Sequence, residues 1–210
     1  MTSESPTTPR SRKLPRWIPE GVLILASVVL GFGVAQYGEY RGDRQLATRV
    51  LQGVEAELNQ NLLLLEPMLP FHREWVDALA SAETVPGQAG LDVWFATRPN
   101  LPAPVKTPFA TPRRSAWDAA LAGGSLRLLD YDVTAALSEI YRAQEILTDN
   151  VNRLASGALS QTATYDPTSR DASVRLLWLT LADIHAAEAL LLELYRQHVP
   201  LIQKAAERTR

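Results

Sequence analysis

The feature that most constrains the fold is an uncharged stretch near the start of the chain. Residues 21–35, GVLILASVVLGFGVA, contain no ionisable side chain. Trp17 precedes this apolar run, and Tyr37 and Tyr40 follow it. Aromatic residues are enriched at the two boundaries between lipid and water. The 21 residues from Trp17 to Tyr37 make about 31 Å of helix, which matches a bilayer core of about 30 Å. We expect a transmembrane helix over residues 17–38, with Trp17, Tyr37 and Tyr40 as membrane-interface anchors.

The flanking charges suggest an orientation for this helix. Residues 1–16 are rich in Ser, Thr and Pro and become basic toward their end, which predicts a disordered basic tail. Four lysines and arginines precede the apolar run, whereas three follow it within fifteen residues. Positive charge concentrates on the cytoplasmic side of membrane proteins, so the tail is expected in the cytoplasm. Residues 39–210 would then form an extracytoplasmic domain.

A cleavable signal peptide is the alternative interpretation of the same run. Gly33 and Ala35 have the small side chains and the spacing that a signal peptidase requires, and the basic segment before the run also fits. Helix-compatible sequence, however, continues from the run directly into QYGEYRGDRQLATRVL. This continuity favours a retained anchor.

One face of the expected membrane helix carries only small residues. Ser27, Gly31 and Ala35 follow one another at intervals of four, and small residues at this spacing let a second membrane helix approach closely. Glycine and alanine are also common in membrane helices that pack against nothing in particular. We expect the Ser27, Gly31 and Ala35 face to pack against other membrane-protein subunits or against a second copy of the chain.

The rest of the chain has the composition and periodicity of helices. Leucine and alanine dominate it. Two segments carry apolar residues at alternating steps of four and three, which is the pattern of a helix with one buried seam. The first seam is Ala47, Leu51, Val54, Leu58, Asn61, Leu65 and Met68, and the second is Val133, Leu137, Ile140, Gln144, Leu147, Val151 and Leu154.

Each seam is interrupted by one amide, Asn61 in the first and Gln144 in the second. A buried amide can fix the register of neighbouring helices. It can also line a small-ligand pocket between helices. Tryptophans 75, 94, 117 and 178, together with Tyr131 and Tyr141, are expected to fill the core, and would indicate a partner surface if several proved exposed together.

Between the two seams the periodicity is weaker. Pro67 and Pro70 are expected to end or bend the first long helix, and a short helix is expected over Phe71–Ala82. Residues 83–114 lose all periodicity and contain five prolines between Pro99 and Pro112. They predict a long Pro-rich loop.

Three further signals mark helix ends. Ser115 is suited to cap a short helix that Gly123 and Gly124 close, and Asp132 is suited to cap the second long helix. Residues 157–169 are expected to form a polar loop before the last long helix, Asp171–Ala206.

The last helix is apolar on nearly every side, yet its core contains Asp183, His185, Glu188 and Glu193. Acidic residues at the centre of a membrane helix cost roughly 2.5–3.5 kcal/mol each. We therefore expect it to be buried in protein. The predicted fold class is all-α: a single N-terminal transmembrane helix followed by a soluble helical bundle of three long and two or three short helices.

No known reaction motif is present in the sequence. The net charge of −2 argues against nucleic acid as a partner, and a chain without cysteine has no disulfide and no thiolate metal site. Nucleophile-elbow and phosphate-loop motifs are absent. None of the three histidines has a glutamate three residues before it, although His185 and Glu188 share a helix face in the reverse order. We expect no catalytic residue, no cofactor and no metal site.

Four segments resemble a group of uncharacterised bacterial single-pass inner-membrane proteins with an extracytoplasmic helical domain. They are ELNQN at 57–61, FHREWVDAL at 71–79, AWDAALAGGSLRLLDYD at 116–132 and IYRAQEIL at 140–147. The resemblance covers about a third of the chain and transfers no catalytic residue or ligand. It implies a bacterial inner membrane with the main domain in the periplasm.

The leading functional hypothesis is a non-catalytic accessory or scaffolding subunit that docks onto a larger membrane complex through its membrane helix and helical domain. The alternative is an extracytoplasmic small-molecule sensor that acts through a partner. An enzyme ranks third, and it would need a concave site holding His185 and Glu188.

Overall fold

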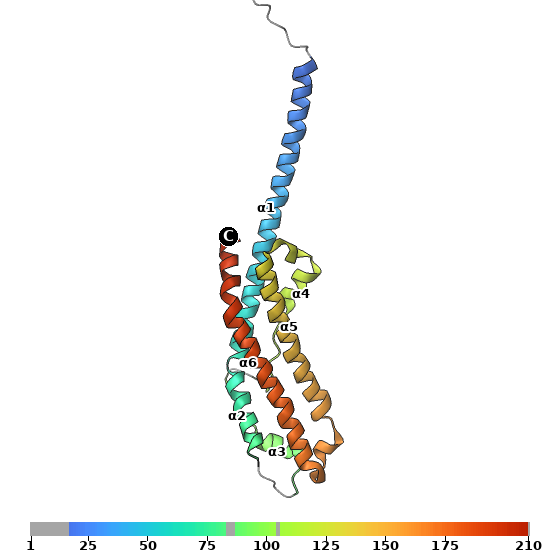
Figure 1. Ribbon diagram of the computed structural model, residues 1–210, viewed down its shortest axis with the longest axis vertical. Helices are drawn as coiled ribbons and strands as arrows, with labels where there is room; N and C mark the ends of the chain where they lie inside the picture. The colour runs from blue at the N-terminus through green and yellow to red at the C-terminus, as the bar shows by residue number, and fades with distance from the viewer. Residues whose placement is uncertain (1–16, 83–86, 104–105, 210) are drawn as a thin grey trace, which may run out of the picture. The chain divides into compact units, whose positions relative to one another are not determined.

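The computed structural model describes residues 17–82, 87–103 and 106–209, with side chains from residue 23 to residue 208 within these ranges. Every regular element in these ranges is helical, which confirms the predicted all-α fold class (Figure 1). The α-helices are α1 (Trp17–Leu65), α2 (Met68–Ala80), α3 (Gly90–Thr97), α4 (Ser115–Ala122), α5 (Tyr131–Arg153) and α6 (Arg170–Thr209). Three are long (α1, α5 and α6) and the rest are short, as expected.

The chain divides into two units, which meet between Asp43 and Arg44. The first unit contains the apolar start of α1, and its described side chains, from Leu23 to Asp43, are all exposed. Helix α1 is long and apolar enough to cross a membrane, although a signal sequence near an N-terminus meets the same criterion. The two interpretations drawn from the sequence both fit this helix.

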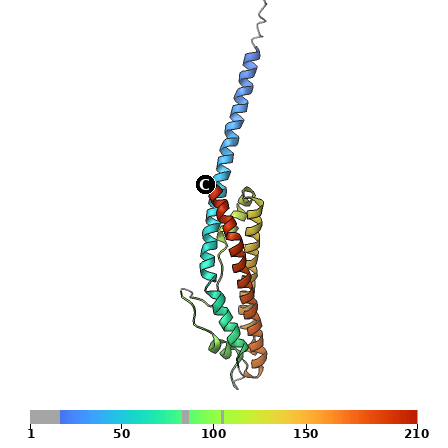
Figure 2. The ribbon, with the colours of Figure 1, turned by 60° about the vertical axis from the view of Figure 1, so that its left-hand side comes forward.

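The second unit is a helical bundle. Helix α6 packs against α5, α2 and α3 (Figures 1 and 2). The first predicted seam is buried at every position from Ala47 to Met68, and the second is buried except at Val151, which is half-buried. Each seam forms one side of a shared hydrophobic core. The prediction that the apolar last helix is buried in protein is supported by Leu177, Leu181 and Ile184, which are fully buried.

The proline pair separates α1 from α2 as predicted, but α2 begins three residues earlier than expected and ends at Ala80. Pro67 occupies the N-cap and Pro70 lies in the first turn. Proline is tolerated there because the first amides of a helix have no intrahelical acceptor. Met68 is therefore both the last residue of the first seam and the first residue of α2.

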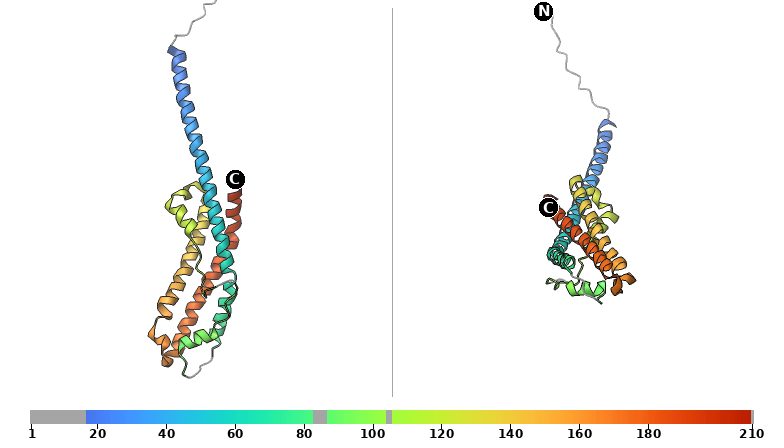
Figure 3. Two further views of the ribbon diagram at one scale, coloured as in Figure 1. Left: turned by 180° about the vertical axis from the view of Figure 1, so that it is seen from behind. Right: turned by 60° about the horizontal axis from the view of Figure 1, so that its bottom comes forward.

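Helix α3 lies inside residues 83–114, where no helix was predicted. It has only eight residues, and tertiary packing decides its formation. Val93 and Trp94 are buried against the core, and the Ala89 amide donates to the Asp92 carboxylate at 3.3 Å. A Cβ at Gly90 would come within 2.5 Å of the Ser173 Cβ, so the start of α3 lies directly against α6. Helix α3 and the start of α6 are seen at the lower end of the bundle in both views of Figure 3.

Both predicted N-caps are displaced by one or two residues. Ser115 is the first residue of α4 and Arg114 is its N-cap, because the Ser115 hydroxyl donates to Glu57 instead of capping its own helix. Helix α5 begins at Tyr131 after Asp130, so Asp132 lies in the first turn, where its charge still favours the positive end of the helix dipole. Gly124 adopts φ 64°, in the left-handed region, and closes α4 as expected.

Residues 154–169 are more ordered than a polar loop. A π-helical turn continues α5 over Leu154–Ala158, and 3-10 turns follow at Thr162–Tyr165 and Pro167–Ser169. Helix α6 then continues to Thr209 with Pro200 inside it.

Candidate functional site

The first unit exposes a continuous apolar surface. Exposed fractions of its large apolar side chains between Leu23 and Val34 range from 48% at Val28 to 72% at Val34. No described residue packs on Gly31, because a Cβ built there meets nothing within 4 Å. The Ser27 hydroxyl donates to the Leu23 carbonyl at 2.8 Å, so its proton is satisfied within its own helix. Ser27, Gly31 and Ala35 are all exposed.

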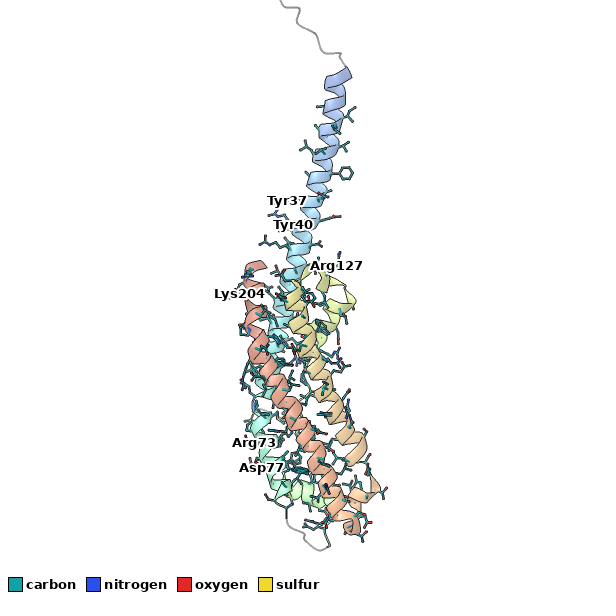
Figure 4. The ribbon with its side chains drawn as sticks, viewed as in Figure 1. Tyr37, Tyr40, Arg73, Asp77, Arg127 and Lys204 are labelled. Atoms are coloured by element: carbon teal, nitrogen blue, oxygen red, sulfur yellow. The ribbon has the colours of Figure 1, made fainter. Side chains whose placement is uncertain are left out.

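Two of the three expected interface anchors are described. Tyr37 and Tyr40 are 60% and 63% exposed and extend from α1 (Figure 4). The Arg41 guanidinium lies over the Tyr37 ring, 5.4 Å from its centroid, a distance at which a cation is attracted to an aromatic face. The Trp17 side chain lies outside the described side chains.

A buried ion-pair site joins α2 to α6 in the second unit. His72 Nδ1 lies 2.8 Å from the Glu188 Oε2, and the two side chains are 0% and 1% exposed. His72 Nε2 lies 2.7 Å from the Pro108 carbonyl oxygen. Aromatic rings enclose the imidazole: it stacks on Phe109 with centroids 5.4 Å apart and on Trp75 at 6.3 Å. The site therefore holds three segments together, namely α2, α6 and the chain around Pro108.

The two hydrogen bonds of His72 define how many protons the site contains. The Pro108 carbonyl can only accept, so Nε2 carries a proton. A second proton lies between Nδ1 and the Glu188 carboxylate, either as imidazolium with carboxylate or as neutral imidazole with carboxylic acid. Both forms have zero net charge, which is what a group removed from water requires.

Two buried polar atoms have no hydrogen-bond partner among the described residues: Oε1 of Glu188 itself and Nε1 of Trp75, whose ring stacks on His72. His185 lies near the same pair on α6. Burial lowers the pKa of His185, and the charge of Glu188 partly offsets that effect. The sequence places Glu188 near His185, but the hydrogen-bond partner of Glu188 is His72.

A second buried carboxylate, Glu57 of α1, ties α4 and α5 to the first seam. Its Oε1 accepts from the Tyr141 hydroxyl at 2.7 Å. Its Oε2 accepts from the Ser115 hydroxyl at 2.7 Å and from the Ala116 amide at 2.9 Å. Burial and the hydrogen bond to Glu57 raise the pKa of the Tyr141 phenol. Glu57, which is only 6% exposed, thus fixes the start of α4.

The two seam amides both connect elements of the bundle. Asn61 accepts from the Arg113 amide at 2.8 Å and donates to the Arg113 carbonyl at 2.7 Å. Gln144 donates to the Tyr195 hydroxyl at 2.7 Å. Burial raises the pKa of Tyr195 to about 12, although the amides of Gln144 and Asn61 oppose the rise. These contacts favour the structural interpretation of the amides over a ligand pocket.

The described pockets lie at the surface of the bundle. One, of about 360 Å³, lies between the end of α2 and the start of α6 and is lined in part by Arg170, Arg175 and Trp178. A second, of about 400 Å³, lies between α1 and α4. Within the described ranges, no three His, Cys, Asp or Glu side chains come close enough together to hold a metal ion.

Comparison with known proteins gave no match to a family, a curated protein or a solved structure.

Proposed function

We propose that the protein is a non-catalytic accessory or scaffolding subunit, anchored in the bacterial inner membrane by residues 17–38. The observation that carries the proposal is the fully exposed apolar surface from Leu23 to Val34. Exposed apolar side chains in the bundle are scattered among buried ones, whereas the large apolar side chains between Leu23 and Val34 are all exposed. Lipid tails would cover them without any change to the helix.

The docking surface on the membrane helix is the face of Ser27, Gly31 and Ala35. A Cβ at Gly31 meets no atom within 4 Å, so another helix backbone can approach there. The Ser27 hydroxyl is already bonded within the helix, so it adds no unsatisfied donor in lipid. Such close packing is a main source of helix association in membranes.

The bundle contributes a rigid body. Its buried carboxylates each join separate helices: Glu57 of α1 accepts from Tyr141 of α5, and Glu188 of α6 pairs with His72 of α2. Polar groups that hold helices together in this way suit a rigid module, which supports a role in assembly. The slight excess of positive charge before the apolar run favours a cytoplasmic N-terminus and a periplasmic bundle.

The two glycines of the apolar run provide a matched test. Gly31 lies on the small-residue face and Gly33 lies on another side of the helix, and both have open space around an added Cβ. Gly31→Leu should reduce the amount of co-purifying partner after mild detergent extraction by roughly tenfold or more. Gly33→Leu should leave it unchanged. Equal effects of the two variants, or a wild-type protein that elutes as a partner-free monomer, would contradict the proposal.

The pocket between α2 and α6 favours a second candidate, a small-molecule sensor. Arg170 is paired with Asp171 in the pocket wall at 2.9 Å, so Arg175 supplies the positive charge and Trp178 supplies an aromatic surface. A small carboxylate with an apolar body would match both. Benzoate and similar aromatic acids should then raise the melting temperature of the full-length protein, and Arg175→Gln should remove that rise. No rise with any of them would leave the accessory role as the sole candidate.

A further inference from the structure

Several segments of the bundle meet at one end, which we call the Arg44 end. Arg44 is the first residue of the second unit, and its Nη2 donates to the Arg208 carbonyl near the end of α6 at 3.4 Å. Leu46 and Arg49 line one groove together with residues at the end of α4, including Gly123. The start of the unit, the α4 turn and the last turn of α6 therefore lie together.

The Arg44 end exposes large apolar side chains. Leu46 is 41%, Leu121 is 56% and Tyr131 is 84% exposed. Tyr131 was expected in the core, and its exposure corrects that expectation. The phenol of an exposed tyrosine and the apolar side chains beside it suit an interface between lipid and water.

The charge at this end is opposite in sign to that of the whole chain. Five exposed cations lie there (Arg44, Arg49, Arg127, Lys204 and Arg208), against three exposed anions (Asp130, Asp132 and Glu207). Arg127 and Lys204 lie at this end and Arg73 and Asp77 lie nearer the other end (Figure 4). The chain as a whole has a net charge of −2, so the positive excess is local.

We propose that the Arg44 end of the bundle lies against anionic phospholipid headgroups, with Leu121 and Tyr131 at the boundary and the cations against the phosphates. The inference rests on the proposed membrane anchor. Six residues separate Tyr37 from Arg44, and so short a connection cannot exceed about 25 Å. An anchored chain therefore keeps this end close to the membrane surface, where its cations can contact the phosphates of anionic headgroups.

Single-site labelling of the full-length chain tests the contact. The natural sequence has no cysteine, so Leu121→Cys or Tyr131→Cys gives one site for an environment-sensitive fluorophore. Tyr165→Cys is the control, because Tyr165 is 57% exposed and lies close before α6 begins, at the other end of the bundle. Each variant is reconstituted in vesicles of phosphatidylcholine, with or without phosphatidylglycerol, that contain headgroup-level quencher lipids.

The inference predicts roughly twofold quenching at positions 121 and 131, dependent on phosphatidylglycerol, and little at 165. Arg127→Gln combined with Lys204→Gln should reduce it. The inference would be overturned by equal quenching at positions 121 and 165, or by quenching that is the same with and without phosphatidylglycerol. Flotation of the same vesicles separates the two proposals: a chain that floats without quenching at 121 or 131 contradicts the headgroup contact alone, whereas a chain that does not float contradicts the anchor as well.

Discussion

Two helical segments of this chain are similar in apolar content and opposite in environment. Residues 23–34 of α1 expose every side chain, whereas residues 176–194 of α6 bury one side in the bundle. Ionisable residues distinguish them: the first segment has none, and the second has Asp183, His185, Glu188 and Glu193. In α6, Asp183 and Glu193 are exposed and Glu188 is paired with His72. Apolar content alone therefore does not determine burial, and the placement of polar residues does.

The largest expected effect on stability comes from replacing Glu188, the carboxylate that α6 buries. Glu188→Leu leaves the His72 imidazole without its partner in the core, and breaking such a pair costs roughly 3–5 kcal/mol of unfolding free energy. The double variant His72→Leu with Glu188→Leu should recover most of the loss, because no charge remains unpaired. Urea denaturation measures both values. A single substitution that costs less than about 1 kcal/mol would show that the pair does not constrain α6.

The next effect compares exposed leucines of the two segments. Leu30 is 68% exposed in the first and Leu190 is 51% exposed in the second. Leu30→Arg should weaken membrane retention, since arginine at the centre of a membrane helix costs roughly 2.5–3.5 kcal/mol. Leu190→Arg should leave both retention and melting temperature nearly unchanged, because that side chain faces water. Retention is measured as the fraction that resists carbonate extraction. Similar retention of both variants would contradict the claim that Leu30 faces lipid whereas Leu190 faces water.

The bundle should also lose stability in alkali. Burial raises the pKa of Tyr195 to about 12, whereas a tyrosine in the unfolded chain ionises near pH 10. Between these values the folded state binds more protons than the unfolded state, so stability falls as pH rises from 10 to 12. The contribution of Tyr195 is about 2–3 kcal/mol.

Unfolding midpoints at pH 8 and pH 11 measure this slope. Tyr195→Phe should reduce it, and Tyr131→Phe, which removes an exposed phenol, should not. Identical slopes for wild type and Tyr195→Phe would exclude Tyr195 as the source.

The smallest effect separates a tight contact from an open one. Gly90→Ala drives a Cβ to 2.5 Å from the Ser173 Cβ and should cost roughly 1–3 kcal/mol, as overpacking does. Gly53→Ala meets only the Ala116 Cβ at 3.9 Å, and should gain up to about 1 kcal/mol from helix propensity. Thermal unfolding measures both changes in stability: the melting temperature should fall for Gly90→Ala and rise for Gly53→Ala. A neutral Gly90→Ala would mean that α3 can move away from α6.

The local patterns of the sequence predicted much of this fold. Both seams were correct because a step of three and four residues is a property of one helix and needs no knowledge of its neighbours. Helix α3 was missed because eight residues carry little periodicity and it depends on the contact at Gly90. Ser115 was assigned the wrong role because the acceptor of its hydroxyl, Glu57, lies 58 residues away.

The buried ion pair could not be predicted for the same reason. His72 and Glu188 are 116 residues apart, and neither segment by itself indicates the partner of its buried polar residue. A buried position for Glu188 was visible from its apolar neighbours in α6. Its partner depends on how α2 packs against α6, which a single sequence does not contain.

The central claim is that residues 17–38 stay in lipid as part of the mature chain. The most direct test is flotation of native membranes followed by sequencing of the N-terminus of the protein recovered with them. Our account predicts a membrane-bound chain that still contains the residues before Gln36. A protein found free of membranes and beginning at Gln36 would contradict it.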